Sequence, residues 1–274
     1  MNRSPSELMR MYQIRAKKRM GQCFLHDPMV IARILENSEI NEEDTVIEIG
    51  SGFGVLTRPL AKQAKRVLAI EKDPALVQFL EEDLADLENV EIKRQDALVF
   101  DFAYSWGDSV KVVGNIPYNI SSPLLFRLLD YRKYIRSATV MLQKEVADRL
   151  VAKCGTKVYG GPSVIFQQYA KVNICFHVGR GAFFPAPRVD SAVVNIKMRE
   201  RPKVAVDEKM FRRVVRAAFA YRRKTLARAL KEEFPKERIS EALQMAKLDG
   251  RLRGEAIGIE AFAELATALN MAEK

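Results

Sequence analysis

Between residues 45 and 145 the chain alternates short apolar strands with amphipathic helices, and this alternation constrains its fold more than any other feature. Runs typical of buried strands occur at 45–50, 66–72, 90–96, 109–116 and 137–143. Apolar residues at helical spacing occupy 54–64 and, behind a proline suited to a first turn, 74–87. Strands that alternate with helices form right-handed crossovers, so we expect an α/β fold with a doubly wound, mostly parallel sheet.

Two further apolar segments extend this sheet in sequence order. Residues 171–179 and 191–198 are predicted strands, separated by a loop rich in proline and aromatic residues, and we expect them to form an antiparallel hairpin at one sheet edge. The pattern becomes helical after this, with a predicted helix over 208–231. We therefore predict one domain over residues 1–202, including a basic N-terminal arm, and a small helical domain over 203–274.

The net charge of +10 is concentrated in two segments. Residues 1–20 carry +5 and residues 199–231 carry +9, which leaves −4 for the remainder of the chain. Two basic segments beside a mildly acidic body indicate a polyanionic partner, and nucleic acid is the first candidate. The candidate RNA contacts in the second segment are Arg222, Arg223 and Lys224.

Cysteine, histidine and hydropathy exclude several other classes. Cys23, Cys154 and Cys175 are far apart and odd in number, so we expect neither a disulfide framework nor a zinc site, and a reducing cytoplasmic compartment. Two histidines do not make a metal site, and we expect no metal. No apolar run approaches the roughly 20 residues that span a bilayer, and no apolar block follows the basic N-terminus, so we expect neither a membrane association nor a secretory signal.

Three consecutive predicted strands end in residues suited to a nucleoside. Glu48 and the glycines at 50, 52 and 54 follow one another where the first strand ends, and glycines there allow a ligand to approach the backbone closely. The second strand ends in Glu71, 23 positions after Glu48, where a carboxylate can accept from both ribose hydroxyls. The third ends in Asp96, which can accept from the amino group of an adenine. Together they predict an adenosine-containing ligand.

The fourth strand ends in Asn115-Ile116-Pro117-Tyr118, a combination that a simple turn does not require. The pattern resembles the Asn-Pro-Pro-Tyr-like motif of S-adenosylmethionine-dependent methyltransferases that act on amino nitrogens. The Asn115 amide oxygen and the Ile116 carbonyl can each accept one N–H of an exocyclic amino group, while proline fixes the backbone between acceptors. Tyr118 offers a face on which the base can stack. Positioning and electrostatics would supply most of the rate enhancement.

Further segments resemble one family over nearly the whole chain. The stretches at 18–25, 141–164, 183–194 and 220–230, together with VIEIGSGFG and GNIPYNIS, occur in the order seen in the ribosomal RNA adenine N6,N6-dimethyltransferases. The best fit is the small-subunit type. The resemblance implies a Rossmann-like class I methyltransferase fold, S-adenosyl-L-methionine as methyl donor and S-adenosyl-L-homocysteine as product. It also implies dimethylation of two adjacent adenosines in the 3′-terminal hairpin of small-subunit rRNA, on the small ribosomal subunit precursor, with a role in biogenesis.

The resemblance also assigns residues to the two halves of the site. The implied cofactor contacts are Gln22, Leu25, Glu48, Gly50, Gly52, Glu71, Lys72, Asp96, Ala97 and Asn115. The implied catalytic residues are Asn115, Ile116, Pro117, Tyr118 and Phe183, with Phe183 covering the other face of the target base. One position departs from the common bacterial pattern GQNFL, because this chain has Cys23 in place of that asparagine.

Two alternatives remain open at this point. One is a related enzyme that dimethylates a single large-subunit rRNA adenine, and the other is a ribosome-assembly factor that keeps the fold without catalysis. YGGPSV and GQCFL fit the small-subunit type better, and the intact motif residues argue against lost chemistry. Without the resemblance, Phe183 and Phe184 would be assigned to the core. We expect a monomer.

Overall fold

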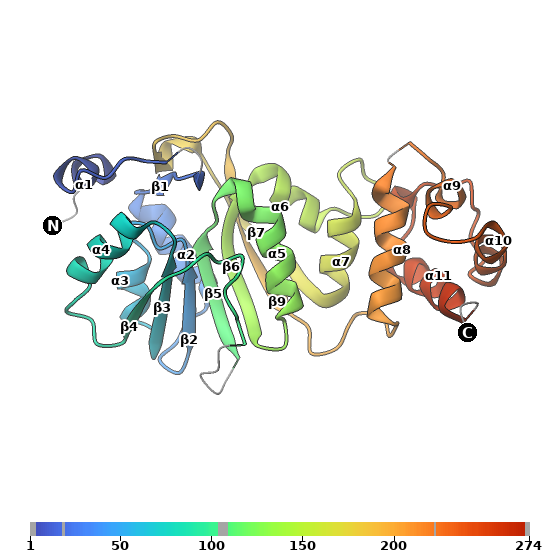
Figure 1. Ribbon diagram of the computed structural model, residues 1–274, viewed down its shortest axis with the longest axis horizontal. Coiled ribbons are helices and arrows are strands. Elements are labelled where there is room, and N and C mark those ends of the chain that lie inside the picture. The colour runs from blue at the N-terminus through green and yellow to red at the C-terminus, as the bar shows by residue number, and fades with distance from the viewer. Residues whose placement is uncertain (1–3, 18–19, 104–108, 222, 272–274) are drawn as a thin grey trace. The chain divides into compact units, whose positions relative to one another are not determined.

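The computed structural model describes residues 4–17, 20–103, 109–221 and 223–271 (Figure 1). Contacts divide the chain into two compact units. The first comprises residues 1–147 and 173–198, and the second comprises 148–172 and 199–274. The chain therefore leaves the first unit near residue 198, close to the predicted boundary at 202, but the segment 148–172 belongs with the C-terminal helices, which the sequence did not indicate.

A seven-stranded sheet forms the centre of the first unit, flanked by helices (Figure 1). In spatial order its strands are β4 (Val90–Arg94), β3 (Arg66–Glu71), β2 (Thr45–Ile49), β5 (Val110–Asn115), β6 (Ile135–Gln143), β9 (Ser191–Met198) and β7 (Ala170–Val178). The strands from β4 to β6 pair in parallel, and β9 pairs antiparallel with β6. The predicted α/β fold, with its antiparallel strands at one edge, is confirmed.

The inner strands are apolar along most of their length because both faces of the sheet are covered. In β2 the residues from Val46 to Ile49 are all buried, and Ile47 pairs with Leu68 of β3 on one side and Val112 of β5 on the other. Such runs are typical of parallel strands between two helix layers. The strand order reverses between β2 and β5, because β3 and β4 lie to one side of β2 and β5 and β6 to the other. Ligands of doubly wound sheets bind at the carboxyl ends of the strands beside such a reversal.

Helices of the first unit begin at clear sequence signals. They are α1 (Pro5–Met11), α2 (Pro28–Ser38), α3 (Thr57–Ala61), α4 (Pro74–Asp83), α5 (Ser121–Asp130) and the start of α6 (Lys144–Val151), with 3₁₀ turns η2 (Tyr118–Ile120) and η3 (Arg180–Ala182). Asp27 and Asp73 cap α2 and α4, each followed by a proline that suits the first helical position. The helix predicted over 54–64 is shorter than expected, since the glycine turn continues to Leu56 and α3 starts only at Thr57.

A two-stranded ribbon lies outside the main sheet. Strands β1 (Phe24–Leu25) and β8 (Phe183–Phe184) pair antiparallel, with Phe24 opposite Phe184 and Leu25 opposite Phe183. Strands of two residues carry no periodic pattern, so this pairing has no signal in the sequence.

The second unit is helical. It contains α7 (Gly161–Tyr169), α8 (Glu208–Ala220), α9 (Leu226–Leu230), α10 (Lys236–Met245), η4 (Gly254–Ala256) and α11 (Ile259–Met271). The single helix predicted over 208–231 is wrong, because the backbone is extended at Tyr221 and Thr225 and two helices form instead. The backbone N–H of Leu226 donates to the Leu252 carbonyl at 2.7 Å and that of Ala227 to Gly250 at 3.0 Å. In a continuous helix these two N–H groups would donate to carbonyls four residues earlier in the chain. Among the described helices none is long and apolar enough to cross a membrane.

Candidate active site

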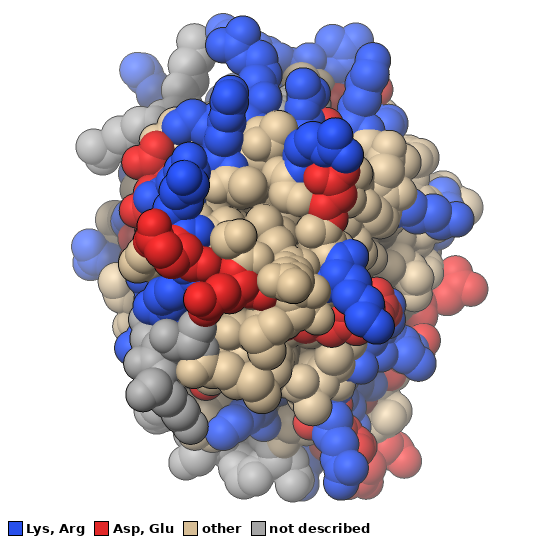
Figure 2. Space-filling view, turned by 90° about the vertical axis from the view of Figure 1, so that its right-hand side faces the viewer, with Lys and Arg blue, Asp and Glu red and all other residues tan. Residues whose placement is uncertain are grey.

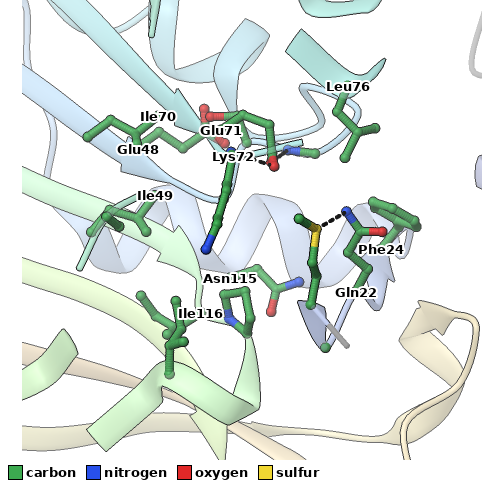
Figure 3. A pocket seen from close by; sticks show the side chains of 18 of the residues that line it. Gln22, Phe24, Glu48, Ile49, Ile70, Glu71, Lys72, Leu76, Asn115 and Ile116 are labelled. Atoms are coloured by element: carbon green, nitrogen blue, oxygen red, sulfur yellow. Dashed lines mark hydrogen bonds between the residues drawn. The ribbon is translucent and has the colours of Figure 1, made fainter. Parts of the chain in front are cut away.

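A cavity of about 160 Å³ opens at the carboxyl ends of the strands, beside the reversal between β2 and β5 (Figure 3). Its walls include every residue predicted to contact the cofactor: Gln22, Leu25, Glu48, Gly50, Gly52, Glu71, Lys72, Asp96, Ala97 and Asn115. Ile116, Pro117 and Tyr118 line it as well. The structure thus brings together segments from five places in the chain, and their individual roles stay predictions.

The turn after β2 requires glycine at three positions. Gly50, Gly52 and Gly54 have φ of +73°, +56° and +69°, a region that side chains rarely adopt. A Cβ at Gly50 would also lie 3.3 Å from the Asn115 carbonyl oxygen, so the backbones after β2 and β5 come close together. Gly50, Ser51 and Gly52 all line the cavity, so a ligand there can approach the backbone of this turn closely.

Glu71 is held in place by backbone donors. The N–H of Gly52 donates to one carboxylate oxygen at 3.1 Å, and those of Lys72 and Asp73 both donate to the other at 2.8 Å. Burial raises the pKa of Glu71 even though these bonds oppose the shift. A carboxylate has roughly four acceptor positions, so about one remains for a ligand hydroxyl. Accepting both ribose hydroxyls, as the sequence suggested, would require one backbone donor to give way.

Asp96 forms an ion pair at the rim of the cavity. Lys72 Nζ lies 2.7 Å from one oxygen of Asp96, and the N–H of Leu98 donates to the other at 2.9 Å. Partial burial alone would raise the pKa of Asp96, but the bonds from Lys72 and Leu98 hold it below its ordinary value. The carboxylate predicted to accept from adenine is therefore ionised and already oriented by two donors.

The Asn115 side chain is fixed by the N-terminal segment. Its amide Nδ2 donates to the main-chain carbonyl of Cys23 at 2.9 Å. Because the nitrogen side of the amide is engaged, the Oδ1 side is the one left to accept from a ligand. Gly114, just before it, lies so close to β2 that a Cβ there would stand 2.5 Å from the Ile49 carbonyl oxygen. The position of Asn115 is thus set by both its backbone and its side chain.

Tyr118 is anchored through its hydroxyl. The phenol oxygen shares a 2.6 Å hydrogen bond with the hydroxyl of Ser191, which is buried at the start of β9. Burial raises the pKa of Tyr118, so its phenol is neutral near pH 7. One turn on, the Ser121 hydroxyl donates to the Pro117 carbonyl at 3.2 Å. These bonds hold the ring and the motif backbone in one arrangement before any base arrives.

A family model described as ribosomal RNA adenine dimethylase matches residues 13–270. The chain belongs to the ribosomal RNA adenine dimethylase family.

Three relatives illustrate the match. A ribosomal RNA small subunit methyltransferase A from Syntrophus aciditrophicus (strain SB) is 42% identical over 96% of this chain and 98% of its own. The crystal structure of a dimethyladenosine transferase from Plasmodium falciparum superposes with a TM-score of 0.78 at 27% identity, covering 88% of this chain and 95% of the other. That of the 23S rRNA methyltransferase ErmE gives 0.69 at 29% identity, covering 90% and 99%. The resemblance stated from the sequence is confirmed, and rRNA methyl transfer is the activity class of this dimethylase.

The structure buries one of the residues predicted to be catalytic in the dimethylase. Phe183 is only 3% exposed, packs in the hydrophobic cluster that contains Leu25, and is not among the residues lining the cavity. The next residue, Phe184, is 41% exposed. Neighbouring residues of a strand point to opposite faces, so β8 turns one ring into the core and the other outward. In this structure Phe183 offers no open face to a base.

The predicted RNA contacts of the dimethylase differ among themselves. Arg222 lies outside the described residues. Arg223 is exposed, whereas Lys224 pairs with Glu232 at 3.0 Å and lies 3.5 Å from the ring centre of Tyr221. The three are adjacent in the sequence, but Lys224 lies just before α9 and pairs with Glu232, which lies just after it.

Two groups that hold the motif, the Cys23 carbonyl and the Ser191 hydroxyl, were not predicted from the sequence. The first is made by the main chain, so no residue type signals it. The second comes from a serine at the start of a strand, which is an ordinary position. In the part of the chain that the structure describes, no cluster of His, Cys, Asp and Glu is arranged to hold a metal ion.

Glu48 is the most deeply buried acid of the dimethylase cavity, at 1% exposure. The Thr57 hydroxyl donates to its carboxylate at 2.5 Å. Burial nevertheless dominates and raises the pKa of Glu48 from 4.5 to about 7. A raised carboxyl pKa means that the folded protein binds more protons than the unfolded chain between pH 4.5 and about 7. Stability contributed by this group is therefore lost as the pH rises through that window.

We predict that Glu48→Gln removes this loss. Relative to wild type, the free energy of unfolding of the variant should improve by roughly 2 kcal/mol between pH 5.5 and pH 8, because glutamine does not ionise. Urea unfolding of both proteins at the two pH values measures the difference. A difference between variant and wild type that does not change with pH would show that Glu48 titrates near its ordinary value.

Proposed function

We propose that this chain transfers methyl groups from S-adenosyl-L-methionine to the N6 amino groups of two adjacent adenosines in the 3′-terminal hairpin of small-subunit rRNA. The observation that carries the proposal is the Asn115 amide at the cavity wall, whose nitrogen donates to the Cys23 carbonyl, which leaves its oxygen to accept from a ligand. Similarity to a small-subunit methyltransferase over 96% of the chain supports the choice of substrate. We expect the enzyme to act as a cytoplasmic monomer on small-subunit precursors.

The cavity walls fit an adenosyl cofactor. The glycine turn lets a ligand approach the backbone, Glu71 keeps an acceptor position for a ribose hydroxyl, and Asp96 is an ionised acceptor beside Ala97. When bound, S-adenosylmethionine supplies a methyl group on a positively charged sulfur. S-adenosylhomocysteine would leave as the product.

On the target side, the motif would hold the amino group rather than deprotonate it. Asn115 Oδ1 and the Ile116 carbonyl would each accept one N–H, which turns the nitrogen lone pair away from them. The Tyr118 ring, fixed by Ser191, would support the base from one face. With Tyr118 neutral and no strong base in the motif, the proton would leave to water after transfer. Catalysis then rests on orientation and fixed dipoles.

A basic surface for RNA is the remaining requirement. The second unit has 22 lysines and arginines against 13 aspartates and glutamates, a net charge of +9. Figure 2 shows a face on which lysine and arginine side chains gather along the upper part, with acidic side chains beside an uncharged centre. Cationic side chains release counterions when they meet phosphates, so this surface would supply much of the RNA affinity. We propose the helical unit as the RNA-contacting part.

Replacing the motif asparagine tests the chemistry. Asn115→Ala should lower kcat by roughly 10²- to 10³-fold, because one preorganised contact to the reacting group is lost. RNA affinity should change little, since the basic surface is intact. Single-turnover methyl transfer and RNA titration measure the two quantities. Asn173→Ala, at an exposed position of β7, is the matched control. Normal turnover in Asn115→Ala would refute the assigned role.

Replacing the basic residues tests the RNA surface. Arg223 and Arg228 are exposed, and neither has an ion pair among the described residues. The double variant Arg223→Gln/Arg228→Gln should bind rRNA more weakly and reduce the slope of log affinity against log salt by about one unit per lost contact. Lys224→Gln is the matched comparison and should have less effect, because Glu232 already neutralises Lys224. Equal slopes in the double variant and wild type would exclude these two contacts.

A further inference from the structure

Asp73 is a buried charge near the cavity that the proposed chemistry does not use. Its side chain is 0% exposed, yet it is not among the residues that line the cavity. One carboxylate oxygen accepts from Lys17 Nζ at 2.7 Å and from the N–H of Ala75 at 3.2 Å. The other accepts from Gln22 Nε2 at 3.0 Å. A cap for α4 would need only the bond to Ala75, so the two long-range donors call for another explanation.

Those two donors, Lys17 and Gln22, belong to the N-terminal segment whose residues 20–25 line the cavity. Gln22 not only donates to Asp73 but also accepts from the backbone N–H of Lys17 at 2.7 Å. Lys17, Gln22 and Asp73 therefore form a closed triangle, which we call the Asp73 latch. Residues Met20 to Leu25, which include Gln22 of the latch, line the cavity, and Gln22 and Phe24 are seen there in Figure 3.

The same segment reaches the motif on the other side of the cavity. Cys23, next to Gln22, presents the carbonyl that accepts from Asn115 Nδ2. Gly21, on the other side of Gln22, has φ of +64°, and a Cβ there would stand 2.8 Å from the Asn119 side-chain oxygen. The segment thus fits closely against residues 115–119. Any displacement of Gln22 would carry the Cys23 carbonyl with it.

An amide is nearly symmetric in shape but opposite in hydrogen bonding at its two ends. If the Cys23 carbonyl moved away, the Asn115 amide could rotate and present its N–H₂ to the target amino group. Two donors would then face each other, and the acceptor needed for methyl transfer would be lost. The carbonyl therefore selects the productive orientation.

We infer that Lys17 and Asp73 are positioning residues that act on Asn115: by holding Gln22 they place the Cys23 carbonyl where it orients the catalytic amide. This inference rests on the proposed function. The segment that lines the proposed cofactor cavity would then also orient the amide that binds the target base. A family position occupied by cysteine is compatible with this geometry, because the contact is made by the main chain.

The test is a double-mutant cycle between the latch and the motif. Lys17→Met and Asp73→Asn are each made in wild type and in Asn115→Ala, and asparagine preserves the cap of α4 because it is an equally good N-cap residue. Methyl transfer to small ribosomal subunits that lack the modification gives kcat and the KM for S-adenosylmethionine. Lys197→Met, which cuts the ion pair between Lys197 and Glu39 (2.8 Å), is the control for losing a charge pair.

In wild type, each latch variant should lower kcat about tenfold and raise the KM for S-adenosylmethionine, with Lys17→Arg restoring most of the loss. In Asn115→Ala, the same variants should raise that KM but leave the residual kcat within twofold, because the amide they orient is gone. Lys197→Met should match wild type in both constants.

Equal fold losses of kcat in the two backgrounds would overturn the inference, since the latch would then act on stability or on another group. An unchanged kcat in the latch variants would overturn it too. Wild-type protein that fails to methylate small subunits would instead refute the proposed function, so the two failures are distinguishable.

Discussion

The parallel pairing of β2 with β5 brings the two halves of the site together. Ile49 pairs with Gly114, and only a glycine fits against the Ile49 carbonyl at that point. The glycine turn after β2 and the motif after β5 consequently emerge side by side, at the place where the strand order reverses. Methyl transfer requires a donor and an acceptor held within a few ångströms in a fixed orientation. A small residue at one strand position makes that proximity possible.

Three buried acids surround this junction, and each is satisfied in a different way. Glu48 has a hydroxyl donor and a raised pKa, Glu71 has three backbone donors, and Asp73 has a lysine and an amide. Buried carboxylates are costly unless they are protonated or fully bonded, so each also fixes the groups that serve it. Glu71 fixes the glycine turn, and Asp73 fixes the N-terminal segment. Hydrogen bonds to these acids thus hold the glycine turn and the N-terminal segment in one conformation beside the cavity.

Sequence patterns predicted the strands and the site residues that directly follow them. The strands, the glycine turn and the Asn115 motif were visible because buried parallel strands are continuous apolar runs and each site residue follows one directly. Tertiary contacts decided the rest. Backbone bonds from Leu226 and Ala227 to residues 250–252 split the predicted long helix, and the β1–β8 ribbon turned Phe183 inward. The Cys23 carbonyl had no signal at all, since every residue has one.

Dimethylation of small-subunit rRNA adenosines at this site can be tested directly with isolated ribosomal subunits. Purified protein is incubated with labelled S-adenosylmethionine and, separately, small and large ribosomal subunits from a strain that lacks the modification, and the modified nucleosides are identified by mass. We expect dimethyladenosine in small-subunit rRNA alone, at two adjacent positions. Label confined to large-subunit rRNA, or tight binding to small subunits without any transfer, would contradict it.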